Sequence, residues 1–277
     1  MTITDQQVKS HRSPSQYRMW LRCEAQYYFR YAEGLKMPPG SALTLGISTD
    51  EALAYNFTEK KQTGQDEPAS QVLDFYVAEF EKRKDQTIWF SDENPTQLRD
   101  DAGKALSQYH KDECPSLQPA EVHPDLSVTL ETFSADLKQY GDLITTDQRV
   151  IDFKTASKSP PKGRAASFDD ELQMVSYHLG YEARRKQPPT GTELHYLVRK
   201  KEPKAVIVPV TVDAEATRFY ENFVSRVEEA LQRHETLGWS PVPNRSHFLC
   251  SKRFCGYWSV CEKTFGGSVR DGIKTTE

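Results

Sequence analysis

Residues 140–155 read YGDLITTDQRVIDFKT and have the pattern of a β-hairpin. The runs 137–145 and 149–155 on either side of residues 146–148 predict the two strands of this hairpin. The polar tripeptide at 146–148 between them is typical of a short turn. The second strand is rich in β-branched and aromatic residues, so we expect it to lie inside a sheet.

Two carboxylates and a lysine are expected to meet on this hairpin. Asp152 and Lys154 are two positions apart, so a strand directs both side chains to the same face. Asp142 lies about as far from the turn on the partner strand, where opposite residues are close neighbours. Such carboxylates, together with the backbone carbonyl of Phe153, can hold Mg²⁺, while the lysine orients a water molecule or stabilises charge on a phosphate. The alternative is an ordinary hairpin with a surface ion pair, but the apolar neighbours make unpaired charge costly there.

The chain on either side of the hairpin predicts helices first and then an α/β core. A capping box at Ser13 begins the first helix, which we expect to end near Tyr31. The further helices expected are 46–61, 68–84, 95–111, 167–186 and 213–235, and the further strands are 126–133, 193–199 and 205–212. This order predicts a restriction-endonuclease-like α/β fold in which helices flank a mixed central sheet. We expect a helical N-terminal lobe (1–118), the core (119–236) and an irregular tail (237–277), packed as one compact unit.

The predicted helix after the hairpin carries a second polar pair. Gln173 and Tyr177 are four positions apart and share a helix face, from which both can point back toward the acidic patch. The loop that joins the second strand to this helix carries Lys158, Lys162 and Arg164. Basic runs are usually solvated, but these three residues lie next to the acidic patch, so we expect them to contact DNA phosphates.

Composition sets limits on the kind of protein. Of the 277 residues, 37% are hydrophobic and 27% are charged, as in a globular protein with a sizeable core. The net charge of −4 argues against indiscriminate binding of polyanions, although it allows a local basic groove. We find no apolar stretch that approaches the ~18 residues of a membrane span, and no secretion signal. We therefore expect a cytoplasmic protein, in which disulfides are disfavoured.

The cysteines then need another explanation. Cys250, Cys255 and Cys261 lie within a dozen residues of the tail, and Cys23 lies in the first predicted helix. Four thiolates can bind either zinc or an iron–sulfur cluster, and the residues alone leave both possibilities open.

The motifs together resemble the RecB-type branch of the PD-(D/E)XK nuclease superfamily. That branch has Gly-Asp on one strand, Asp-x-Lys-Thr on the next and Gln-x-x-x-Tyr on the following helix. The corresponding residues here are Gly141-Asp142, Asp152 to Thr155, and Gln173 with Tyr177. The resemblance implies a nuclease that uses Mg²⁺ or Mn²⁺, with Asp142 and Asp152 as ligands and Lys154 as the base or the water-orienting group.

The resemblance also assigns the cysteines. AddB and the CRISPR-associated exonucleases carry one cysteine before the nuclease core and three after it, and these bind a [4Fe–4S] cluster. Cys23 and the tail cysteines match that arrangement, whereas Cys114 lies outside it. The resemblance thus implies a cluster that clasps the N-terminal lobe to the C-terminal tail.

One position departs from the family pattern. The family has Gly-x-x-x-His in the second helix, with the histidine at the metal. This chain has Gly46 followed by Asp50 in the histidine position, so Asp50 is expected to be a metal ligand. The alternative is a solvent-exposed aspartate in the first turn of a helix, where the helix dipole favours it.

These inferences predict a DNA exonuclease that acts on single strands or DNA ends in recombination, repair or phage DNA processing. No phosphate-binding loop of a helicase is present, so unwinding would need a helicase or recombination partner. The alternatives are a non-catalytic DNA-binding or assembly subunit, a zinc-bound structural protein, and a nuclease of CRISPR spacer acquisition.

Overall fold

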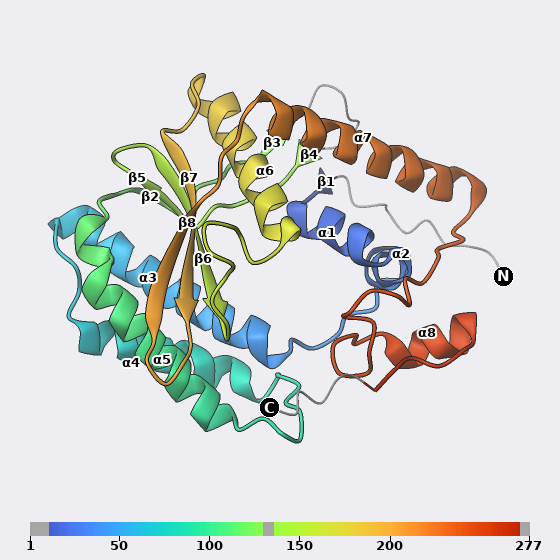
Figure 1. Ribbon diagram of the computed structural model, residues 1–277, viewed down its shortest axis with the longest axis horizontal. Coiled ribbons are helices and arrows are strands. Elements are labelled where there is room, and N and C mark those ends of the chain that lie inside the picture. Colours follow the sequence, from blue (N-terminus) through green and yellow to red (C-terminus); the bar gives the residue numbers. More distant parts are fainter. Residues whose placement is uncertain (1–10, 130–135, 272–277) are drawn as a thin grey trace. The chain divides into compact units, whose positions relative to one another are not determined.

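The computed structural model describes residues 11–129 and 136–271 (Figure 1). Its internal contacts divide the chain into two compact units. One unit combines the described parts of 1–38, 129–138 and 221–277, and the other combines 39–128 and 139–220. Each unit therefore joins segments that are distant in the sequence.

A five-stranded sheet forms the centre of the second unit. Its strands are β2 (Pro119–Val122), β5 (Leu143–Thr145), β6 (Arg149–Ala156), β7 (Gly191–Val198) and β8 (Lys204–Pro209), in the order β2-β5-β6-β7-β8. Neighbouring strands are antiparallel except for β6 and β7, which are parallel. The sheet is thus mixed, which confirms the predicted fold class.

The predicted hairpin is formed by β5 and β6. Leu143 pairs with Ile151 and Ile144 pairs with Val150, so the turn lies at 146–148. The parallel pair β6 and β7 requires a crossover, which α6 (Phe168–Arg185) provides. Ser167 caps this helix by accepting a hydrogen bond from the backbone N–H of Asp170, at 3.1 Å.

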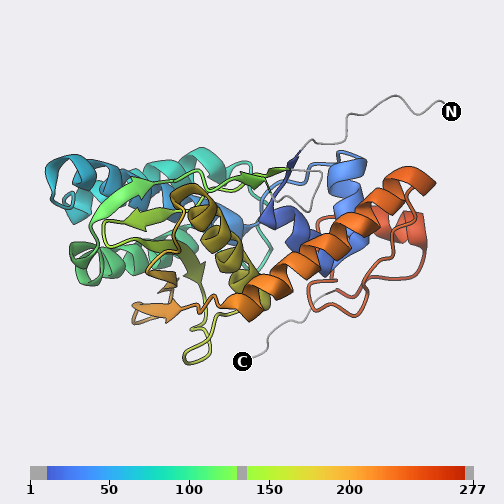
Figure 2. The ribbon, with the colours of Figure 1, turned by 90° about the horizontal axis from the view of Figure 1, so that it is seen from above.

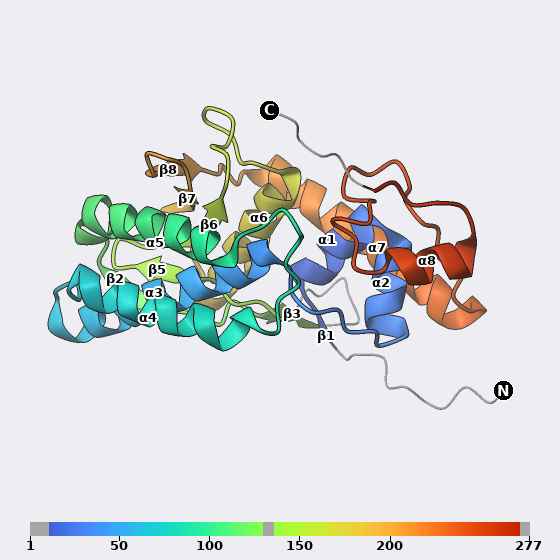
Figure 3. The same cartoon turned by 90° about the horizontal axis from the view of Figure 1, so that it is seen from below.

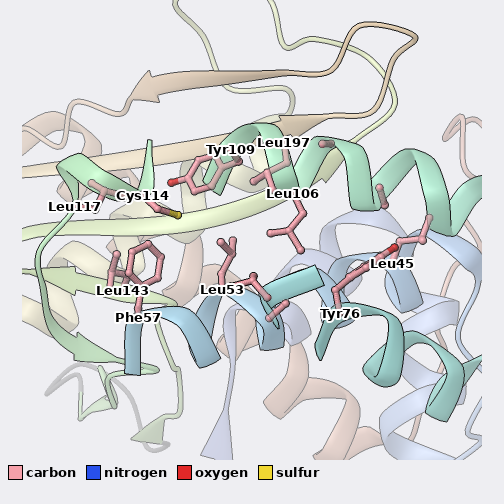
Figure 4. Packing of buried hydrophobic residues seen from close by; sticks show 14 of the residues in the cluster. Leu45, Leu53, Phe57, Tyr76, Leu106, Tyr109, Cys114, Leu117, Leu143 and Leu197 are labelled. Atoms are coloured by element: carbon pink, nitrogen blue, oxygen red, sulfur yellow. The ribbon is translucent and has the colours of Figure 1, made fainter. Parts of the chain in front are cut away.

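Three helices cover one face of the sheet. They are α3 (Ser41–Thr63), α4 (Ala69–Lys84) and α5 (Pro95–Asp112), which lie together in Figure 3. Phe57 and Leu53 of α3, Tyr76 of α4 and Leu106 of α5 share one core with Ile151 of β6 and with other sheet residues (Figure 4 shows part of it). Strand residues whose side chains point to the opposite face of the sheet are apolar as well, because that face is also covered.

Helix α6 covers that opposite face (Figure 2). Met174, Tyr177 and Tyr181 of α6 pack with Val150 of β6 and with residues of β7 and β8. Side chains alternate along a strand, so Asp152 and Lys154 lie on the same face of β6 as Val150 and are directed toward α6.

The first unit contains both ends of the described chain. Its elements are β1 (His11–Arg12), α1 (Pro14–Arg22), α2 (Glu24–Tyr27), a π-helical turn (Tyr28–Ala32), β4 (Asp136–Leu137), α8 (Trp258–Phe265) and most of α7 (Ala214–Leu237). The remaining elements are β3 (Val128–Thr129) and a 3₁₀ turn (Cys114–Ser116). Ser13 caps α1 as predicted, by accepting from the backbone N–H of Gln16.

Several predicted boundaries are wrong. The helix expected from Ser13 to Tyr31 breaks at Cys23, whose extended backbone (φ −171°, ψ 115°) ends α1 and begins α2. Helix α3 begins at Ser41, directly after the break at Gly40, and not at Gly46.

The strand predictions also need correction. The run 137–145 is interrupted, because only its ends belong to β4 and β5. In the run 126–133 only β3 is a strand, and 130–133 lies outside the described residues. Strand β2 and helix α8 were not predicted: β2 is short, and α8 lies in a tail whose pattern indicates no regular structure.

Candidate active site

The two hairpin carboxylates lie next to each other, Asp152 within β6 and Asp142 just before β5. Asp142 directly precedes β5, and its Oδ2 accepts a hydrogen bond from the backbone N–H of Phe153, at 2.6 Å. That bond ties the carboxylate to β6, in which Asp152 is the preceding residue. The ring of Phe153 points to the other face, where it packs against Phe57 and Tyr109.

A buried ion pair accompanies these carboxylates. The Nζ of Lys154 lies 2.7 Å from Oδ2 of Asp152, whose side chain is 3% exposed, while that of Lys154 is 22% exposed. Lys154 also donates to Oε1 of Gln173 at 2.8 Å, and Gln173 donates to the hydroxyl of Tyr177 at 2.7 Å. The structure therefore joins Asp152, Lys154, Gln173 and Tyr177 in one hydrogen-bonded chain.

Asp170, one turn earlier on α6, adds a further carboxylate that the sequence did not single out. Its Oδ1 lies 4.0 Å from the Nζ of Lys154, and its Oδ2 accepts from the hydroxyl of Tyr196. Asp170 and Gln173 are three positions apart and therefore share one helix face. That spacing is the sequence signal from which Asp170 could have been predicted as a site residue.

The pKa values of Asp142 and Lys154 are both raised, but for different physical reasons. Burial raises the pKa of Asp142 well above its usual range, and the negative charges of Asp152 and Asp50 raise it further. Burial opposes protonation of Lys154, but Asp152 and Asp170 outweigh it, so the pKa of Lys154 lies above its usual value. Lys154 is therefore a cation at neutral pH.

Asp50 belongs to the same cluster. It is the tenth residue of α3, so the alternative of a first-turn aspartate favoured by the helix dipole is wrong. Its Oδ2 lies 3.2 Å from Nε2 of His123, whereas its Oδ1 is buried and has no hydrogen-bond partner among the described residues.

His123 is the neighbour that sequence reasoning missed. It follows β2 with a left-handed backbone (φ +47°), and its N–H donates to the carbonyl of Asp142 at 3.0 Å. The hydrogen bond to Asp50 raises the pKa of His123, against the opposing effect of burial. No spacing in the sequence relates 123 to 50, because only the tertiary fold brings them together.

The three basic residues of the β6–α6 loop have exposed side chains. Lys158, Lys162 and Arg164 lie on the surface, while Pro160 between them is buried. Their side chains can therefore reach a ligand. The loop joins β6, which contains Lys154, to α6, which contains Gln173.

A family model of the PD-(D/E)XK nuclease superfamily matches residues 11–262. The chain belongs to this superfamily. A proposed exonuclease of Eubacterium rectale has a similar fold, with a TM-score of 0.64 and 13% sequence identity over 99% of this chain and 97% of that one. A search of curated proteins finds no match.

The nuclease also has a second cluster of ligand-type residues, in the first unit. Cys23, Cys250, Cys255 and Cys261 line one pocket, together with Phe29, Pro243 and other residues. None of them forms a disulfide. Cys114, by contrast, is buried in the core of the second unit, beside Tyr109.

Three nitrogen donors point at the sulfur atoms of this pocket. The side-chain amide of Gln26 donates to Sγ of Cys255 at 3.1 Å, the backbone N–H of Asn244 to Sγ of Cys23 at 3.3 Å, and Arg245 to Sγ of Cys261 at 3.4 Å. Burial raises the pKa of Cys255 and of Cys261. Donors of this kind stabilise sulfur that carries negative charge.

Neither cluster is a closed coordination shell in the described residues. Across 11–129 and 136–271, no group of three or more His, Cys, Asp or Glu side chains is gathered in a geometry that could hold a metal ion. In the same ranges, no helix is both long and apolar enough to cross a membrane.

Proposed function

We propose that this member of the superfamily is a metal-dependent DNA exonuclease that acts on single strands or DNA ends. The observation that carries the proposal is the hydrogen-bonded chain from Asp152 through Lys154 and Gln173 to Tyr177, beside Asp142. Hydrolysis of a phosphodiester joins the oxygen of a water molecule to phosphorus, breaks a P–O bond and leaves a proton on the departing oxygen.

The chemistry of the residues present, though not a gathered set of ligands among the described residues, suits a divalent cation. Three negative groups, Asp50, Asp142 and Asp152, lie close enough for the charges of the other two to raise the pKa of Asp142. The buried Oδ1 of Asp50 has no hydrogen-bond partner among the described residues, although a buried acceptor is normally satisfied. These carboxylates and the carbonyl of Phe153 would hold Mg²⁺ or Mn²⁺, which prefer oxygen ligands. Such an ion lowers the pKa of bound water and neutralises charge on the phosphate.

Lys154 supplies the fixed positive charge of the site. Because its pKa is raised, it is suited to orienting water and stabilising the phosphate rather than to removing a proton. Gln173 holds the lysine from α6, and Tyr177 holds Gln173. Lys158, Lys162 and Arg164 would contact DNA phosphates on the way to the site.

The cysteine pocket would hold a [4Fe–4S] cluster, as in the RecB-type branch that the motifs resemble. The support is that four thiols line one pocket and that three of them receive N–H donors. The cluster would clasp α1 and α2 to the tail within the first unit, and it takes no part in hydrolysis. The biological setting that we propose is cytoplasmic DNA recombination, repair or phage DNA processing, with a helicase or recombination partner.

A nuclease assay on end-labelled single- and double-stranded DNA tests the catalytic proposal. We expect cleavage with Mn²⁺ and none with EDTA. Asp152→Asn and Lys154→Ala should each lower the rate by about a hundredfold or more while DNA binding persists, because each removes a group that acts at the phosphate. Asp101→Asn and Lys104→Ala are matched controls, since these residues form an exposed ion pair on α5.

Full activity in both active-site variants would contradict the assignment. A wild-type protein that binds DNA but cleaves none with either metal would instead support the non-catalytic assembly subunit.

A further inference from the structure

His123 makes two contacts with the acidic cluster, one from its backbone and one from its side chain. The backbone N–H donates to the carbonyl of Asp142, while Nε2 lies 3.2 Å from Oδ2 of Asp50. Asp50 is on α3 and Asp142 is at the start of β5, so this one residue links two elements of the proposed cation site. The N–H of Gly141 donates to the carbonyl of Pro124 at 3.0 Å, which fixes the loop on the other side of His123.

The backbone of His123 is held in an uncommon conformation. Its φ of +47° lies in the left-handed region, which few non-glycine residues adopt, although histidine, asparagine and aspartate do so more often than the others. Such conformations persist where surrounding contacts hold them, and they are frequent at functional sites. The two backbone hydrogen bonds to 141 and 142 are the contacts that hold it here.

The two oxygens of Asp50 have different surroundings. A carboxylate oxygen only accepts hydrogen bonds, so Nε2 of His123 carries the proton and donates it to Oδ2. With a proton on Nε2, that nitrogen has no lone pair for a metal. The other oxygen, Oδ1, is buried and has no hydrogen-bond partner among the described residues. The carboxylate is therefore anchored through one oxygen and leaves the second for a ligand.

We infer that His123 is a positioning residue for Asp50: it fixes Oδ2 so that Oδ1 is presented to the divalent cation. The inference rests on the proposed function, in which Asp50 is a ligand. Groups that hold a ligand through a hydrogen bond contribute to metal affinity, and their loss typically weakens it by 10–100-fold. His123 thus acts through Asp50 and does not touch the cation.

Direct titration of Mn²⁺ without DNA tests this role, with free Mn²⁺ followed by its electron paramagnetic resonance signal. His123→Asn keeps a residue that tolerates a positive φ, but its side chain is too short to reach Asp50. His123→Gln keeps an N–H donor on a longer side chain. We expect His123→Asn to weaken Mn²⁺ binding by about tenfold and His123→Gln to recover most of the loss. His178→Asn is the matched control, because His178 is a partly buried histidine paired with Glu182 on α6.

A double-mutant cycle separates action through Asp50 from other effects. Asp50→Ala with His123→Asn should bind Mn²⁺ no more weakly than Asp50→Ala alone, because the histidine has nothing left to position. A further loss in the double variant, unchanged binding in His123→Asn, or a nitrogen hyperfine coupling from His123 to Mn²⁺ would each overturn the inference. Absence of Mn²⁺ binding in the wild type would overturn the proposed function itself, and the inference with it.

Discussion

At the scale of single residues, the balance of charge in the site depends on Lys154. Asp152 is almost fully buried, and the ammonium of Lys154 forms an ion pair with it at 2.7 Å. A buried carboxylate that loses its counter-charge is strongly disfavoured, whereas removal of both members of a pair is much better tolerated. The same lysine thus serves stability as well as the proposed chemistry.

We therefore expect Lys154→Met, studied in EDTA, to lower the free energy of unfolding by about 3 kcal/mol. Asp152→Asn combined with Lys154→Met should be more stable than Lys154→Met alone, because the buried residue 152 then no longer carries a charge that has lost its partner. Urea unfolding followed by circular dichroism measures both. Equal stability of the single and double variants would show that Asp152 does not depend on this partner.

At the scale of elements, α6 contributes residues to the site and also packs closely against neighbouring backbone. One face carries Gln173 and Tyr177 to the lysine of β6, and the helix must therefore lie close to the sheet. Gly180 of α6 packs against the segments that precede β3 and follow β4: a Cβ at this position would lie 2.1 Å from the carbonyl oxygen of Leu126 and 2.6 Å from the side-chain nitrogen of Gln139. That nitrogen is itself bonded to the carbonyls of Leu126 and Ser176.

Gly180→Ala should for this reason destabilise the protein by about 2 kcal/mol or more, since backbone must shift to admit the methyl group. Nuclease activity should fall with it, because α6 moves relative to Lys154. Gly46→Ala in α3 is the matched control: nothing lies within 4 Å of its Cβ position, so helix propensity should leave it neutral or more stable by up to about 1 kcal/mol. Thermal unfolding of both variants distinguishes steric contact from a general effect of the substitution.

At the scale of the whole molecule, residues from both ends of the sequence form the cysteine pocket. Cys23 lies at the junction of α1 and α2, while the other three come from the tail around α8. All four belong to the same unit, and Cys23, Cys255 and Cys261 pack with Phe29 and Tyr257. A metal group bound there would close a loop of more than 200 residues, which should stabilise the fold.

Protein purified without oxygen should accordingly contain about four irons and as many sulfides per chain. Cys255→Ser should lose the iron, the brown colour and much of the solubility. Cys114→Ser, in the core of the other unit, should keep all three. Metal and sulfide analysis decides the question, and stoichiometric zinc without iron or sulfide would contradict the cluster.

The sequence by itself determined the fold class and most of the hairpin. The strand-like runs on either side of the polar turn at 146–148 predicted the pairing of β5 with β6. The spacing of Asp152 with Lys154 and of Gln173 with Tyr177 placed each pair on one face. These features follow from local periodicity, because the geometry of a strand or helix fixes which nearby residues share a face. The continuous first helix failed at Cys23, where periodicity does not mark the backbone break, and α3 begins at Ser41, earlier than the predicted Gly46.

Only the tertiary structure decided how distant segments meet. Asp50 and His123 are 73 positions apart, and they come within 3.2 Å because α3 packs across the sheet beside the loop after β2. Gln26 and Arg245, which donate to cysteine sulfurs of the same pocket, likewise come from opposite ends of the chain. Contacts of this kind depend on the packing of whole elements, and such packing leaves no periodic signal in the chain.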